Sequence, residues 1–153
     1  MLRKIGIIGV LSLMLVAVTA SVALAAPNFK SATSDVANNG ALVVSFDERG
    51  LGNENIDYTL TADATAVFAC FNRGGRNPEA ANKETISEPV VAEASIEPKN
   101  GRVVESITTD PPSAGGFTCP PGQNLVLESV TYTNIVLTDT TNDVSTTVPD
   151  ASS

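Results

Sequence analysis

The two cysteines are the residues of this chain with the most clearly defined chemistry. Cys70 lies in the stretch FACFNRGGR, and Cys119 lies in FTCPPGQN. An even number of cysteines in an exported chain is typical of disulfide bonds. A catalytic or metal-binding pair of thiols would need a neighbouring histidine or a CxxC spacing, and the chain has neither. We therefore predict a structural disulfide between Cys70 and Cys119, worth roughly 4 kcal/mol through the loop that it closes.

Missing residue types exclude several classes of enzyme. The chain has 0 His, which removes Ser-His-Asp and Cys-His nucleophilic catalysis and the ordinary zinc sites. The sequence also contains no G-x-x-x-x-G-K-[ST] stretch and no dinucleotide-binding glycine pattern. We therefore predict a protein that is not an enzyme and that needs no cofactor.

Four acidic residues near one loop are the remaining catalytic option. A glycoside hydrolase uses two carboxyl groups about 5 to 9.5 Å apart, and flat aromatic side chains usually hold the sugar. This chain has 2 Tyr, 5 Phe and 0 Trp, and solvated loop charge explains the acids more simply. A small carboxylate-dependent hydrolase is therefore the least favoured alternative. Its acids would be Asp47, Glu48, Glu54 and Asp57.

The same loop offers oxygen ligands for calcium. Carboxylate, amide and backbone oxygens bind this hard cation, and glycines let such oxygens converge. The stretch DERGLGNENID does not have EF-hand spacing. A calcium-stabilised adhesion or envelope domain is thus the alternative function, with Asp47, Asn53, Glu54 and Asp57 as candidate ligands. A second, weaker set in DTTND comprises Asp139, Asn142 and Asp143.

Two loops rich in glycine and proline are candidates for binding a partner. Arg73, Gly74, Gly75 and Arg76 form one of them, where backbone N–H groups and two guanidinium groups suit an anion. Pro120 and Pro121 belong to the other, directly after Cys119. The predicted disulfide draws both loops to one end of the molecule, and binding residues commonly lie on loops held by a rigid scaffold.

The N-terminal segment is typical of a secretory signal peptide. Two basic residues precede an uncharged apolar stretch from residue 5 to residue 22, and an Ala-rich exit follows. This stretch is long enough for an uncleaved membrane anchor to be an alternative. Pro27 and the small residues before it favour cleavage after Ala25 or Ala26. We therefore predict that residues 1–26 are a signal peptide and that the mature chain is secreted without a membrane anchor.

The charge of the chain limits its partners. Removing Arg3 and Lys4 with the signal peptide takes the formal net charge from −8 to −10. Nucleic acids and anionic membranes both require clustered basic residues. We therefore expect an unidentified protein or a cell-envelope polymer as the partner, and no nucleic acid.

The rest of the chain reads as short strands separated by turns. Alternation of apolar and polar residues is most regular in 56–72, where the ADA stretch suggests a bend or bulge. Pro89 suggests an edge strand, and Asn100-Gly101 suggests a hairpin turn. The expected elements are an arm or edge strand at 27–40, strands near 41–46, 56–72, 86–96, 102–109, 125–139 and 144–148, and a disordered tail at 149–153.

These elements predict an all-β fold. About six or seven turn-separated strands without an amphipathic helix are typical of an antiparallel β-sandwich, and an immunoglobulin-like sandwich closed by one disulfide is the leading candidate. The chain has 0 Trp to pack on the disulfide, and Cys119 lies in a loop, unlike antibody domains. We expect a single domain over 41–148.

The segments FACFNRGGR, FTCPPGQN and SVTYTNIVLTDTTN, together with the signal peptide, also resemble small secreted bacterial β-sandwich proteins of unassigned function. The resemblance covers about residues 41–142 and concerns the order of strands and loops. It implies an exported, disulfide-closed β-domain and assigns no site residues.

Overall fold

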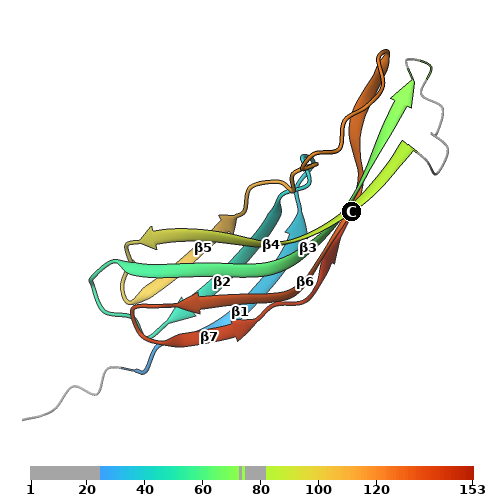
Figure 1. The fold of residues 1–153 in the computed structure, drawn as a ribbon. Coiled ribbons are helices and arrows are strands. Elements are labelled where there is room, and N and C mark those ends of the chain that lie inside the picture. The colour runs from blue at the N-terminus through green and yellow to red at the C-terminus, as the bar shows by residue number, and fades with distance from the viewer. Residues whose placement is uncertain (1–24, 73, 75–81) are drawn as a thin grey trace, which may run out of the picture.

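The computed structural model describes residues 25–72, 74 and 82–153 (Figure 1). These residues form eight β-strands in two antiparallel sheets and contain no α-helix, so the all-β prediction is confirmed. The predicted signal peptide lies almost wholly outside the described residues. Within them, no helix is long and apolar enough to cross a membrane.

The first sheet has three strands and the second has five. The order in the first sheet is β1-β2-β5, with β1 at Asn28–Val36, β2 at Leu42–Arg49 and β5 at Arg102–Thr108. The order in the second sheet is β4-β3-β6-β7. These strands are β4 at Lys83–Ile96, β3 at Ile56–Asn72, β6 at Gln123–Asp139 and β7 at Val144–Thr147. The short strand β8, at Ala151–Ser152, also pairs with β6.

The core lies between the two sheets and follows the alternation of the strands. In β3 the predicted bounds 56–72 are confirmed, and the even-numbered side chains are buried from Ile56 to Cys70. Leu42, Val44 and Phe46 of β2 are buried with them in the same apolar cluster. Alternate side chains of a strand point to opposite faces, so each strand contributes one apolar face to the core.

Two buried tyrosines connect the sheets by hydrogen bonds. Tyr58 of β3 donates its hydroxyl to Glu48 Oε2 of β2 at 2.7 Å. Tyr132 of β6 donates to the carbonyl oxygen of Gly40, in the turn between β1 and β2, at 2.7 Å. At Gly40, φ is +90°, a backbone conformation that other residues adopt only with strain, so glycine is strongly favoured at this turn.

The turn after β4 differs from the predicted hairpin. Lys99 and Arg102 exchange both backbone hydrogen bonds, and Asn100 and Gly101 have φ of 54° and 71°, as the Asn-Gly pair predicts. The strands on its two sides nevertheless enter different sheets, β4 the second and β5 the first. The turn is therefore a crossing between the sheets and not a hairpin within one.

The C-terminal residues also differ from the expectation of a disordered tail at 149–153. Ala151 and Ser152 pair with Tyr132 and Thr131 of β6, and the Ser153 N–H donates to the carbonyl of Val130 at 3.0 Å. These residues are ordered because β7 covers only the last part of β6 and leaves backbone groups that need partners.

Irregular pairing bends β6 at two places. The β3–β6 register shifts between Thr61 and Asp63 and again between Val67 and Phe68, and in both cases β6 carries the extra residue. At the first shift Asn134 has a φ of 52° and donates its side-chain amide to Asp63 Oδ2 at 2.8 Å. The bulge expected at the ADA stretch is therefore present, on the partner strand.

The second sheet projects beyond the first. In Figure 1 the end of β3, the start of β4 and the start of β6 run together past the body of the molecule. The loop from residue 109 to residue 122 joins β5 of the first sheet to β6 at this end. The projecting part of the second sheet is therefore covered by this loop and not by the first sheet.

Candidate functional site

The predicted disulfide is confirmed. Cys70, near the end of β3, is bonded to Cys119 in the 109–122 loop, with the Cα atoms 5.5 Å apart. Cys70 pairs in register with Leu125 of β6, the strand that follows the loop. The bond therefore attaches the loop to the projecting end of the second sheet and does not link the two sheets.

The attached loop forms a groove against β4. The Ser113 N–H donates to Glu88 Oε1 at 3.0 Å, and Ala114 and Phe117 pack against the core cluster. The groove has a volume of about 490 Å³ and is lined by Glu84, Ile86, Ala114, Gly115, Gly116 and Phe117. It combines two large apolar side chains with one carboxylate at the disulfide-bonded end.

The candidate binding residues lie partly at this end. Pro120 and Pro121 are exposed in the turn that leads from Cys119 into β6. Gly74 is exposed, and an added Cβ would meet nothing within 4 Å. The other three candidates, Arg73, Gly75 and Arg76, lie outside the described residues.

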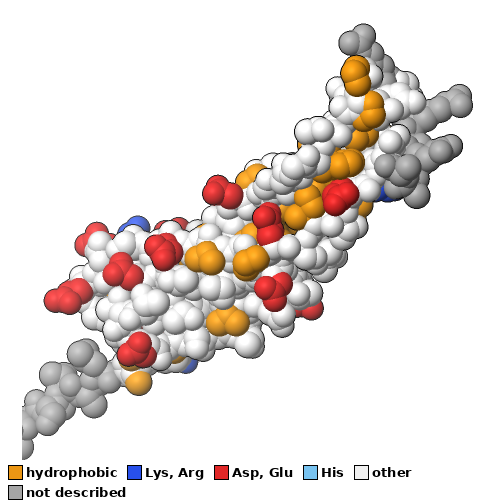
Figure 2. All heavy atoms as spheres, in the orientation of Figure 1, with side chains coloured by type: hydrophobic (Ala, Val, Ile, Leu, Met, Phe, Trp, Pro, Cys, Tyr) orange, Lys and Arg blue, Asp and Glu red, His pale blue; other side chains and the backbone are white. Residues whose placement is uncertain are grey.

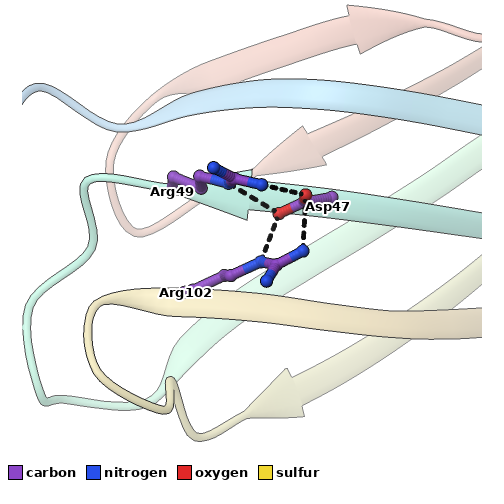
Figure 3. Close-up of polar contacts among 3 residues, drawn as sticks. All are labelled: Asp47, Arg49 and Arg102. Atoms are coloured by element: carbon purple, nitrogen blue, oxygen red, sulfur yellow. Dashed lines mark hydrogen bonds and ion pairs between the residues drawn. The ribbon is translucent and has the colours of Figure 1, made fainter.

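Asp47 lies in a strand and not, as expected, in the loop after it. Its carboxylate accepts two hydrogen bonds from Arg49, at 3.3 and 3.0 Å, and two from Arg102 of β5, both at 2.8 Å (Figure 3). These arginines hold the pKa of Asp47 well below its usual range. Arg49 and Arg102 are opposite each other in the register, so Asp47 also offsets the repulsion of two like charges.

Glu48 also lies in β2, and its side chain enters the core. Its exposed fraction is 0%, and its neighbours Tyr58 and Asp139 are almost completely buried too. Burial is the main cause that raises the pKa of Glu48 to about 7; the Tyr58 hydrogen bond opposes this rise, and the charge of the adjacent Asp139 carboxylate adds to it. Among the described residues, Glu48 Oε1 has no hydrogen-bond partner. When this oxygen is protonated, it can donate towards Asp139.

Asp139 closes the turn between β6 and β7. Its Oδ1 accepts the N–H groups of Thr141 and Asn142 at 2.9 Å each, and its Oδ2 accepts the Asn142 side-chain amide at 2.7 Å. Glu48 and Asp139 are therefore a pair of carboxyl groups inside the sandwich. The pair is not predicted from the sequence, although Glu48 lies on the same face of β2 as Leu42 and Phe46, and this shared face is the signal that could have revealed it.

The four acids of the hydrolase alternative are not gathered in one cleft. Three of them, Asp47, Glu54 and Asp57, are also candidate calcium ligands. Asp47 and Glu48 point to opposite faces of β2, while Glu54 and Asp57 are exposed. A groove of about 390 Å³ beside the loop is lined by Asn53 and Glu54 but by none of the other three acids. In the described part of the chain, no three His, Cys, Asp or Glu residues are grouped as metal ligands would be.

The fold and its covalent bond define an all-β protein of two antiparallel sheets with one disulfide. Comparison of the chain with protein-family models, with curated proteins and with solved structures finds no match to any of them.

Proposed function

We propose that the chain is an exported, non-catalytic binding module with an immunoglobulin-like sandwich, acting at the cell surface or outside the cell. Its binding site is the groove that the 109–122 loop forms against β4, next to the Cys70–Cys119 bond. The partner is a protein or a cell-envelope polymer.

Export is supported by the signal-peptide pattern of residues 1–26 and by the disulfide. Cys70 and Cys119 are at bonding distance, and disulfides persist in oxidising compartments outside the cytosol. Because no free cysteine remains, the chain needs no reducing environment to keep a thiol available.

The strand order supports the immunoglobulin-like assignment. In that architecture the first, second and fifth strands share one sheet, and the third, sixth and seventh share the other. The same division occurs here, with β1-β2-β5 in one sheet and β3-β6-β7 in the other. The fourth strand is the variable one, and here β4 pairs with β3.

The groove supports a binding role because it is rigid, partly apolar and at the molecular surface. The disulfide anchors one end of the 109–122 loop, and the Ser113–Glu88 hydrogen bond anchors its middle. Pre-organised loops lose less conformational entropy on binding than mobile ones. Ile86 and Phe117 supply the apolar surface that recognition sites commonly use. This disulfide-anchored groove is the observation on which the proposal rests.

A charge introduced into the groove tests the proposal. Gly116 has open space at its Cβ, so Gly116→Glu adds a carboxylate to the groove without a clash. Gly52 has the same open space and lies in the loop that precedes β3, away from the disulfide, so Gly52→Glu is a matched control. The measurement is saturable binding of the exported chain to isolated cell envelope and to proteins of the culture medium.

We expect Gly116→Glu to weaken this binding about tenfold or more, which corresponds to at least about 1.4 kcal/mol. Gly52→Glu should bind as the unmodified chain does. Equal binding by both variants, or no saturable binding by the unmodified chain, would refute the proposal.

A further inference from the structure

The first part of β6 is an unprotected sheet edge. On one side, Gln123–Ser129 pairs with β3, and on the other side the described partners of β6 begin only at Val130, with β8 and the residues after it. Among the described residues, no strand covers this side from 123 to 129. A strand edge of this kind presents backbone N–H and C=O groups that favour pairing with another strand.

This edge is also apolar on its surface. Leu125 and Val126 are 42% and 41% exposed and adjacent in sequence; the other two exposed large apolar residues, Val91 and Val104, are single residues on β4 and β5. Figure 2 shows hydrophobic side chains extending along the projecting part of the second sheet. A groove of about 460 Å³ borders the same edge, with Val126 and Leu127 on one wall and Ser153 and the Val36–Gly40 turn completing it. An added strand would therefore meet both open backbone groups and apolar side chains.

Three other edges, those of β4, β5 and β1, are protected or occupied. Edge strand β4 contains Pro89, which has no N–H, and three glutamates. The middle residue of β5 is Glu105, so two copies of β5 would bring like charges together. Edge strand β1 is covered by the C-terminal segment, where Ser34 donates its hydroxyl to the carbonyl of Pro149 at 2.5 Å.

The β6 edge is complementary to itself. An antiparallel pair of two copies centred on Val126 sets Val126 against Val126 and Leu125 against Leu127, all of which lie before the bulge residue Glu128. No like charges meet in this register. Glu128 is paired with Lys83 at 2.7 Å, so it brings no unpaired charge to the edge.

We propose that two copies of this chain associate through their β6 edges, in an antiparallel pair centred on Val126, to form one continuous sheet. The association is isologous: the same segment of each copy supplies both halves of the interface, as two-fold symmetry requires. The stretch of β6 from residue 123 to residue 127 is uncharged, so two copies can approach here without placing like charges opposite each other. This inference does not depend on the proposed binding groove.

The mass of the exported chain in solution tests the proposal. Sedimentation over a wide range of protein concentration should give twice the monomer mass at the upper end, with the disulfide intact. Val126→Lys sets two ammonium groups against each other at the two-fold axis and should leave only monomer. Val91→Lys makes the same change at a strand residue that is 59% exposed but lies on β4, and should leave the dimer unchanged.

A cross-linking measurement tests the register. Val126→Cys should give a covalent dimer that reductant dissolves, because residues opposite each other in an antiparallel pair are at disulfide-bonding distance. Val91→Cys should not. The proposal is overturned if the unmodified chain stays monomeric throughout, if Val126→Lys leaves the dimer intact, or if the two cysteine variants cross-link equally.

Discussion

The buried carboxyl of Glu48 makes stability depend on pH in a direction opposite to that of most acidic residues. An exposed glutamate in the unfolded chain has a pKa near 4.5, and burial beside Asp139 raises that of folded Glu48 to about 7. Between these values the folded chain binds a proton that the unfolded chain has released. The contribution of Glu48 is therefore fully present below about pH 4.5 and is lost as the pH rises through about 7.

The size of the effect follows from the two pKa values. One unit of pKa corresponds to about 1.4 kcal/mol, so the rise from 4.5 to about 7 corresponds to about 3 kcal/mol in the free energy of unfolding. Most of this, about 2–3 kcal/mol, should be lost between about pH 5 and about pH 8. Asp47 does not contribute in this window, because its arginine partners lower its pKa and it is ionised throughout.

Urea unfolding at the two pH values, with the disulfide intact, measures the effect. Glu48→Gln keeps a side chain of the same shape but cannot ionise. Between about pH 5 and about pH 8, the unmodified chain should therefore lose about 2–3 kcal/mol more of its free energy of unfolding than the variant does. Tyr58→Phe removes the hydroxyl that donates to Glu48 at 2.7 Å but keeps the carboxyl, so the pH dependence should remain. Parallel pH profiles for the unmodified chain and Glu48→Gln would refute the reasoning.

Four further outcomes are expected. Cys70→Ser should lower the free energy of unfolding by roughly 4 kcal/mol in urea titrations, and an unchanged midpoint would contradict this. Asp139→Asn should cost about 1–2 kcal/mol in the same assay, because an amide NH₂ cannot accept the Asn142 amide; no change in stability would contradict this. Tyr132→Phe should cost about 1–2 kcal/mol, since the buried Gly40 carbonyl loses its donor; a near-neutral effect would argue against the bond. Saturating calcium should leave the melting temperature unchanged, because arginines already occupy both oxygens of Asp47; a rise that Asp57→Asn removes would support the calcium alternative.

The features that the sequence predicts well are local ones. The period-two pattern of 56–72 is sufficient to define β3, because burial of one face imposes that period. The edge position of Pro89 and the turn at Asn100-Gly101 also follow from the backbone chemistry of single residues. The disulfide follows from the number of cysteines and the expected compartment.

The features that the sequence does not predict depend on contacts between distant segments. The turn at Asn100-Gly101 is correctly located, yet its chemistry carries no information on which sheet each flanking strand joins. Pairing of Ala151 and Ser152 with β6 is decided by the length of β7, not by the polar residues of the tail. The Glu48–Asp139 pair requires the strand β2 to lie over the end of β6, which neither segment reveals alone.

The Cys70–Cys119 bond has a consequence for how faithfully the chain folds. Cys70 is opposite Leu125, and Cys119 precedes that residue by a short turn, so the sulfur atoms meet only when β3 and β6 are correctly aligned. A slip of one residue would rotate the Cys70 side chain to the other face of the sheet and separate the two thiols. Oxidation therefore selects one alignment of the two longest strands, and misaligned chains would be recognisable by their unreacted thiols.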